Sequence, residues 1–214
     1  SRGSSVYSSK AIVSMRGLGG KEQSRVLVLI DGVPANKTDG GSVNWNMLNV
    51  AGISKIEIAK GPASSVYGPN AMGGVIQVIT KKPDTALCGR VSLRAGSYGT
   101  IGGNLYLGGK VLTDKERRDR YFYWTLTGMG MNGKGYYTEP SDSVIASDTT
   151  IVRSYVKEYG AGTRLGYVFN PKHSVEAEVN YYDDWRGSGT KVVEPRGGFT
   201  RHATWQARGR YRIT

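Results

Sequence analysis

A period-two alternation of polar and apolar residues is the feature of the C-terminal half that most restricts its fold. In residues 174–182 the valines fall on one face of an extended chain, while Glu176 and Glu178 fall on the other. Residues 203–213 repeat this pattern, with arginines on the polar face. Weaker versions recur in segments 90–95, 101–107, 121–131 and 159–169. Because one face suits lipid and the other suits water, the pattern predicts six antiparallel strands of a membrane barrel.

The connections between these strands alternate in length, which is typical of a barrel with short periplasmic turns and longer external loops. Residues 170–173 form a tight turn, whereas residues 133–155 and 183–201 are long and polar. We therefore expect the two long segments and residues 96–100 outside the cell, with residues 110–120 on the periplasmic side. Parity within the fifth and sixth strands also predicts Glu178 opposite or diagonal to Arg210, and Glu176 near Arg212.

A soluble β-sandwich is the alternative for this half, because it also buries one face of each strand and wets the other. The position of the aromatic residues favours the membrane barrel. They concentrate on the apolar face near strand ends, where a barrel places its interfacial girdles. These residues are Tyr121, Phe122, Trp124, Tyr167, Phe169, Tyr181, Trp205 and Tyr211.

The N-terminal part has a different character, since Tyr7, Trp45 and Tyr67 are its only aromatic residues before position 89. Short apolar runs at 26–30 and 75–80, rich in β-branched residues, predict buried strands, and residues 53–58 predict a third. Asp31-Gly32 is a turn pair, and Gly61-Pro62 ends the third strand. The sequence thus predicts a small α+β domain over residues 1–88 and barrel strands over residues 89–214.

Composition argues against several other classes of function. The net charge of +12 is spread along the chain and accompanies no recognition motif, so nucleic-acid binding is not predicted. Cys88 is alone, and His173 and His202 have no other metal ligands at the usual spacing. No nucleophile motif is present either. We therefore expect neither catalysis nor a metal or cofactor.

A series of short motifs runs through the N-terminal domain in a fixed order. It comprises Arg16-Gly17, the segment IDGVP at 30–34, Lys60-Gly61-Pro62, Tyr67-Gly68 and AMGGVI at 71–76. This series resembles the plug domain of TonB-dependent outer-membrane receptors. The resemblance implies the later part of a plug, followed by the first six strands of an antiparallel transmembrane β-barrel of about 22 strands. It also places the protein in the outer membrane of a Gram-negative bacterium.

The resemblance further implies TonB-dependent active transport of a scarce nutrient, powered from the inner membrane. TonB would act through a segment that this chain lacks. The motifs are most similar to the siderophore, haem and cobalamin branch, and a ferric siderophore is the leading expectation for the ligand. The alternative is a non-transporting outer-membrane β-protein, such as an adhesin or surface receptor. The lipid bilayer is an expected partner, and a surface lipoprotein partner stays open.

The same resemblance points to residues that would contact the ligand or hold the plug. The leading ligand residue is Trp45, whose equally weighted alternative is packing in the plug core or against the barrel wall. The other expected ligand-binding residues are Thr38, Asp39, Asn44 and Asn46 in the plug, and Tyr136, Tyr137, Trp185, Arg186, Arg196 and Arg201 in the barrel half. Arg16, Glu57 and Lys60 are expected at the contact between plug and barrel. For Arg16 and Lys60 the alternative is solvated surface charge.

Overall fold

The chain divides into two compact units, Ser1–Lys81 and Lys82–Thr214. The computed structural model describes residues 13, 26–36, 43–61, 67, 71–113, 119–136, 150–151, 153–187, 191–192 and 199–213. None of the helices within these residues is long and apolar enough to span a bilayer.

The first unit contains a four-stranded mixed sheet. Its spatial order is β2 (Val33–Pro34), β1 (Val26–Ile30), β4 (Gly74–Thr80) and β3 (Ile53–Lys60). Strands β1 and β4 run parallel, and the two outer pairs are antiparallel. Two short 3-10 helices, η1 (Trp45–Met47) and η2 (Val50–Gly52), precede β3. The three strands predicted for this domain are all present.

Asp31 and Gly32 form the two-residue turn between β1 and β2, and both have positive φ, 50° and 84°. An Asp-Gly pair suits such a hairpin because both central residues must adopt this conformation. The Asp31 carboxylate also accepts hydrogen bonds from the backbone N–H (2.9 Å) and the hydroxyl (2.7 Å) of Thr80. The turn residue therefore ties the end of β1 to the end of β4.

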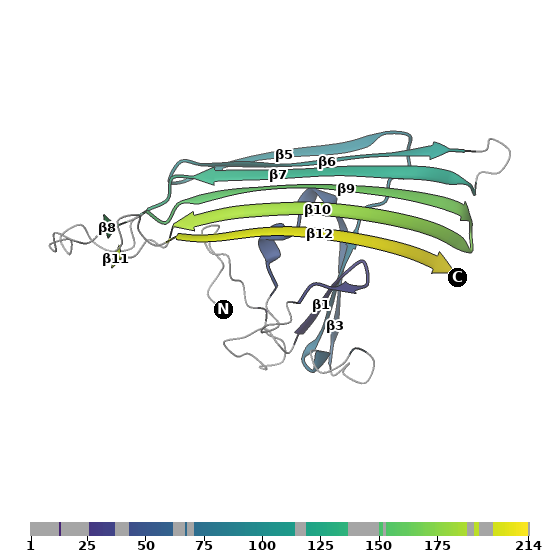
Figure 1. Cartoon of the computed structure of the whole chain (residues 1–214), viewed down its shortest axis with the longest axis horizontal. Coiled ribbons are helices and arrows are strands. Elements are labelled where there is room, and N and C mark those ends of the chain that lie inside the picture. Colours follow the sequence, from purple (N-terminus) through teal and green to yellow (C-terminus); the bar gives the residue numbers. More distant parts are fainter. Residues whose placement is uncertain are drawn as a thin grey trace. The chain divides into compact units, whose positions relative to one another are not determined.

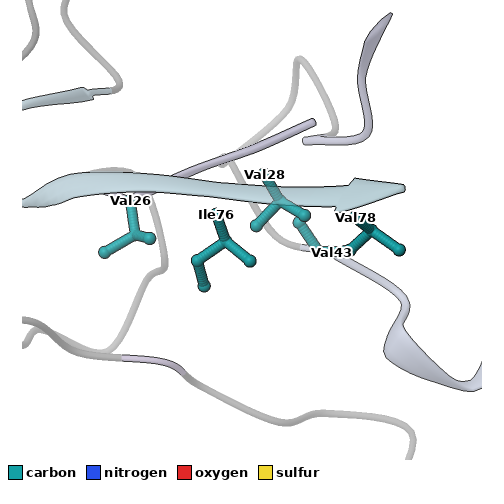
Figure 2. Packing of buried hydrophobic residues seen from close by; sticks show 5 residues of the cluster. All are labelled: Val26, Val28, Val43, Ile76 and Val78. Carbon is teal, nitrogen blue, oxygen red and sulfur yellow. The ribbon is translucent and has the colours of Figure 1, made fainter. Parts of the chain in front are cut away.

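The two central strands, β1 and β4, are buried on both faces, which explains why they are continuous apolar runs. On one face Val26, Val28, Ile76 and Val78 pack with Val43, as Figure 2 shows. The side chains of Leu27, Leu29 and Val75 pack with Ala71 in a second cluster.

The second unit contains six strands that lie side by side in one antiparallel sheet (Figure 1). In chain order they are β5 (Cys88–Gly96), β6 (Thr100–Leu112), β7 (Tyr121–Gly133), β9 (Val156–Asn170), β10 (His173–Gly187) and β12 (Phe199–Ile213). Each strand pairs with the next one in this order. The six predicted strands are therefore confirmed.

The turn between β9 and β10 is tight, as predicted. The Asn170 side-chain oxygen accepts hydrogen bonds from the backbone N–H groups of Lys172 and His173, both at 2.9 Å. Side-chain closure of this kind is why asparagine favours turns.

The predicted loop at 183–201 is partly wrong, because β10 continues to Gly187 and β12 begins at Phe199. The charged residues Asp183 and Asp184, which suggested a loop in the sequence, have partners on the neighbouring strand β12. Trp185, Arg186 and Arg201, expected in a loop, are thus strand residues. The remaining connection holds a short strand, β11 (Lys191–Val192), which pairs with β8 (Thr150–Ile151) from the other long connection.

Candidate functional site

The six-stranded sheet has two chemically distinct faces. One, the apolar face, carries exposed side chains such as Leu93, Val179 and Trp205. The other, the polar face, is the one on which Glu176 lies. Because directly opposed residues share a face, the strand register assigns every described strand residue to one of them.

The first buried ionic network on the polar face is centred on Glu178 and is called here the Glu178 network. Arg164 donates to Oε2 of Glu178 from Nε (3.1 Å) and Nη2 (2.7 Å). Oε1 accepts from Arg208 Nη2 (2.8 Å) and from the Asn180 amide (2.5 Å). The Arg164 side chain is only 5% exposed, so its charge depends on these carboxylates for compensation.

Glu176 extends this network toward the start of the second unit. Its carboxylate accepts a short hydrogen bond from the Tyr123 hydroxyl. Lys82 approaches it at 3.4 Å, and Arg164 and Arg210 each lie at 3.9 Å. The Lys82 ammonium also lies 5.4 Å from the centre of the Tyr123 ring.

The register agrees with the predicted pairing of β10 with β12 and adds the direct partners. Arg210 is indeed diagonal to Glu178, but its direct partner is Glu176, and Glu178 lies opposite Arg208. Arg212 lies opposite Ser174. The predicted relationships therefore hold on the predicted face, because Arg210 is diagonal to Glu178 and Arg212 is diagonal to Glu176.

A second network, the Asp184 network, occupies the same face nearer the long connections. Arg186 donates to Asp184 from Nε (2.6 Å) and to Glu158 from Nη2 (2.5 Å). Tyr182 donates to Glu158 at 3.2 Å, and His202 Nδ1 lies 3.0 Å from Asp184. Asp184 is fully buried, so its charge depends on Arg186 and His202 for compensation.

Cations outnumber acids on the polar face. Among the described strand residues this face carries eight basic and four acidic side chains. The basic residues are Arg90, Arg94, Lys110, Arg164, Arg186, Arg208, Arg210 and Arg212, and the acidic ones are Glu158, Glu176, Glu178 and Asp184. A surface with this excess of positive charge attracts anions.

The structure does not bring the predicted barrel-side ligand residues together on one face. Arg186 lies on the polar face in the Asp184 network, whereas Trp185 and Arg201 lie opposite each other on the apolar face. The Tyr136 ring packs against Tyr98, with centroids 5.0 Å apart. Tyr137 and Arg196 lie outside the described residues.

The predicted plug-side residues are placed only in part. Trp45 opens η1 and packs, partly buried, against the Val28 cluster, as its packing alternative expects. The Asn44 carbonyl accepts from the Met47 N–H at 3.2 Å. The side chain of Asn46 and all of Thr38, Asp39 and Arg16 lie outside the described residues.

Glu57 and Lys60 both lie on β3 with exposed side chains. Glu57 forms an ion pair with Lys55 at 2.6 Å. Lys60 stands opposite Gly74 at the end of the strand. Their expected contacts with the barrel stay predictions.

Sequence reasoning did not single out Arg164, Glu158 or Asp184, although all three are buried charges of the two networks. A signal was present in each case, since all three share the parity of Glu176 through the register. Within the described residues, no group of three or more His, Cys, Asp or Glu side chains could hold a metal ion.

Comparisons with known proteins agree on one family. The family described as TonB-dependent Receptor Plug Domain matches residues 3–75. The vitamin B12 transporter BtuB of Vibrio vulnificus (strain CMCP6) is 41% identical over 78 residues, which cover 36% of this chain and 13% of that transporter.

Solved structures show the same fold across both units. The siderophore receptor PirA of Acinetobacter baumannii matches with a TM-score of 0.58 at 22% identity, covering 82% of this chain and 26% of that one. The ferric enterobactin receptor PfeA, in complex with BCV-L6, matches with a TM-score of 0.58 at 17% identity, covering 92% of this chain and 32% of that one. The chain thus spans about a quarter to a third of these receptors.

Proposed function

Because this chain belongs to the TonB-dependent outer-membrane receptors, we propose that the receptor of which it forms part imports an anionic metal chelate, with a ferric siderophore as the leading substrate class. The observation that carries the proposal is the surplus of cations on the polar face, eight basic against four acidic side chains. In a barrel this face lines the interior, because the apolar face meets lipid.

The position of the charges supports an anionic ligand more than a purely structural role. Acidic side chains take up Arg164, Arg186 and Arg208 at 2.8 Å or less. Arg94 lies on the same face near the end of β5, and its side chain is exposed. Exposed guanidinium groups suit carboxylate or catecholate oxygens, which accept two parallel hydrogen bonds.

Cobalamin is the second candidate substrate. The 41% identity to a vitamin B12 transporter over 78 residues favours it. That similarity covers 36% of this chain, so it cannot extend over the whole polar face that would contact a ligand. The positive charge of the polar face supports the siderophore as the leading candidate, because cobalamin offers far less negative charge than a catecholate or carboxylate chelate.

Energy coupling by TonB is part of the proposal and separates it from the adhesin alternative. We propose that a pull on the plug rearranges the first unit, while the ionic networks keep the wall of the second unit rigid. An adhesin or passive surface receptor would need no such coupling.

Uptake by a receptor-deletion strain tests this function. Cells expressing the complete receptor should accumulate radioactive iron from at least one of a panel of ferric siderophores, and deletion of TonB should abolish that accumulation. Uptake of labelled cobalamin without uptake of iron would make cobalamin the substrate in place of a ferric siderophore. Binding to surfaces or cells that is indifferent to TonB, with no uptake of either label, would favour the adhesin.

A matched pair of variants tests the charge argument within the same assay. Arg94→Gln should raise the half-saturating concentration of the ferric siderophore. Arg212→Gln removes the same charge from the same face at the other end of the sheet and should leave that concentration near the wild-type value. Equal effects of the two substitutions would contradict a local role for Arg94.

A further inference from the structure

The apolar face carries charge only near one end of the described strands. Among the described residues of the six strands, its charged side chains are Lys157, Asp183 and Arg201. All three lie at the end of the sheet that bears the long connections between strands. A charge on a lipid-facing surface is costly in the hydrocarbon region, so this end must lie beyond it.

The spacing of aromatic residues along β9 supports placing this end of the sheet outside the hydrocarbon region. Tyr159 and Phe169 bound the apolar segment of β9, ten residues apart. At about 3.3 Å per residue and a tilt of about 45°, this separation spans roughly 23 Å across the membrane. That is close to the apolar band of an outer-membrane barrel. Lys157 stands two residues beyond Tyr159, roughly 5 Å further out, at the level of the lipid headgroups.

Three side chains form one row at this level. Trp185 on β10 lies directly opposite Lys157 on β9 and directly opposite Arg201 on β12. The Arg201 guanidinium carbon lies 4.6 Å from the centre of the Trp185 ring, and the Phe199 ring stacks on the same indole at 5.5 Å. The row therefore places one cation on each side of the Trp185 side chain, Lys157 on β9 and Arg201 on β12.

Asp183 fixes the orientation of Arg201 from the row beneath. It is fully buried and accepts from Arg201 Nε at 3.2 Å and Nη2 at 2.8 Å. The hydroxyls of Tyr159 (3.3 Å) and Tyr181 (3.1 Å) also donate to it. Since these bonds use Nε and Nη2, the donors on Nη1 can serve a ligand. The Arg201 side chain stays 48% exposed.

We propose that Lys157, Trp185 and Arg201 form a binding site for the phosphate group of a lipid headgroup in the outer leaflet. Charge complementarity supports this occupant, because Lys157 makes no ion pair among the described residues and adds a positive charge beside the Asp183–Arg201 pair. Position supports it as well, because acyl chains of such a lipid would lie along the apolar rows below. The inference rests on the membrane placement of the proposed function and is independent of the transported substrate.

Lipid binding to the complete, purified receptor tests the proposal. Native mass spectrometry would compare a phosphorylated glycolipid from the same outer membrane with that glycolipid after enzymatic dephosphorylation. The wild-type receptor should prefer the phosphorylated lipid. Lys157→Gln should lower this preference about fivefold, as expected for loss of one cation near a charged headgroup.

Controls make the result specific. The triple variant Lys157→Gln, Asp183→Asn, Arg201→Gln leaves no buried charge unpaired and should abolish the preference. Arg212→Gln, a matched loss of charge on the polar face, should retain it. Equal binding of the two lipids by wild type, or an equal loss in Lys157→Gln and Arg212→Gln, would overturn the proposal. So would displacement of the lipid by an equimolar amount of inorganic phosphate.

Transport separates this proposal from the preceding one. Lys157→Gln should leave TonB-dependent uptake unchanged, because Lys157 faces away from the polar face. Absence of uptake in both wild type and variant, with the lipid preference intact, would contradict the proposed substrate and leave the lipid site standing.

Discussion

Tyr123 on β7 lies across Gly166 on β9, and its hydroxyl donates to Glu176 on β10, two strands away. A Cβ atom built on Gly166 would collide with the Tyr123 ring. The absence of a side chain at position 166 is therefore what lets the tyrosine reach the acid. The same bond joins β7 to a strand with which it has no backbone pairing.

We expect Gly166→Ala to destabilise the receptor by about 1–3 kcal/mol, the usual cost of forcing extra volume into a packed site. The measurement is the free energy of unfolding in urea of the complete receptor refolded into bilayers. Gly209→Ala is the matched control, because a Cβ there meets nothing within 4 Å. Equal stabilities of the two variants would show that the Tyr123 packing contributes nothing.

Arg164 should be the most sensitive charge of the Glu178 network, since its side chain is 5% exposed and it contacts two carboxylates. Arg164→Met should cost about 3–5 kcal/mol, because it leaves buried acids without compensation. Adding Glu178→Leu should recover part of that loss for the same reason. Urea unfolding of the single and double variants measures both effects.

An exposed arginine of the same sheet provides the control for charge alone. Arg212→Met should change the free energy of unfolding by no more than about 0.5 kcal/mol. If Arg164→Met were equally mild, the network would have to be more hydrated than its burial indicates.

The sequence was sufficient to predict the six strands and the face of each, because a two-residue period survives any error in strand ends. It was not sufficient to predict the strand ends near the long connections. Asp183, Asp184 and Arg186 resemble loop residues until their partners are known. In the structure Asp183 binds Arg201, and Asp184 binds Arg186 and His202, so the charges are compatible with continued strand pairing.

The same limit applies to the site. Family resemblance suggested Trp185, Arg186 and Arg201 as a group, but adjacent residues on a strand point to opposite faces. Once Trp185 and Arg186 belong to β10, they cannot line one surface. Adjacent residues in a loop can point the same way. Because the sequence placed the end of β10 in a loop, it allowed Trp185 and Arg186 to be expected on one surface.

The orientation of the sheet in the membrane gives a direct prediction. In a Cys88→Ser background, cysteines at Ser97 and Ser188 should react with a membrane-impermeant thiol reagent on intact cells, and one at Lys172 should not. Ser97 lies in the exposed β5–β6 connection, and Lys172 lies in the tight turn at the opposite end of the strands. Labelling of Lys172→Cys alone would reverse the topology.

Trp45 offers the sharpest test of whether a plug residue contacts the ligand or only supports the fold. It packs partly buried against the Val28 cluster, yet it begins a short helix in a polar segment where its indole N–H can meet a ligand. If it contacts the ligand, Trp45→Ala should lower the affinity of the complete receptor for its ferric siderophore while the folded barrel persists on heat-modifiability gels. Leu48→Ala is the matched control, because Leu48 packs against the same cluster without a polar group to offer. An equal loss of affinity in both variants would assign Trp45 to packing, and wild-type affinity in Trp45→Ala would exclude it from the binding surface.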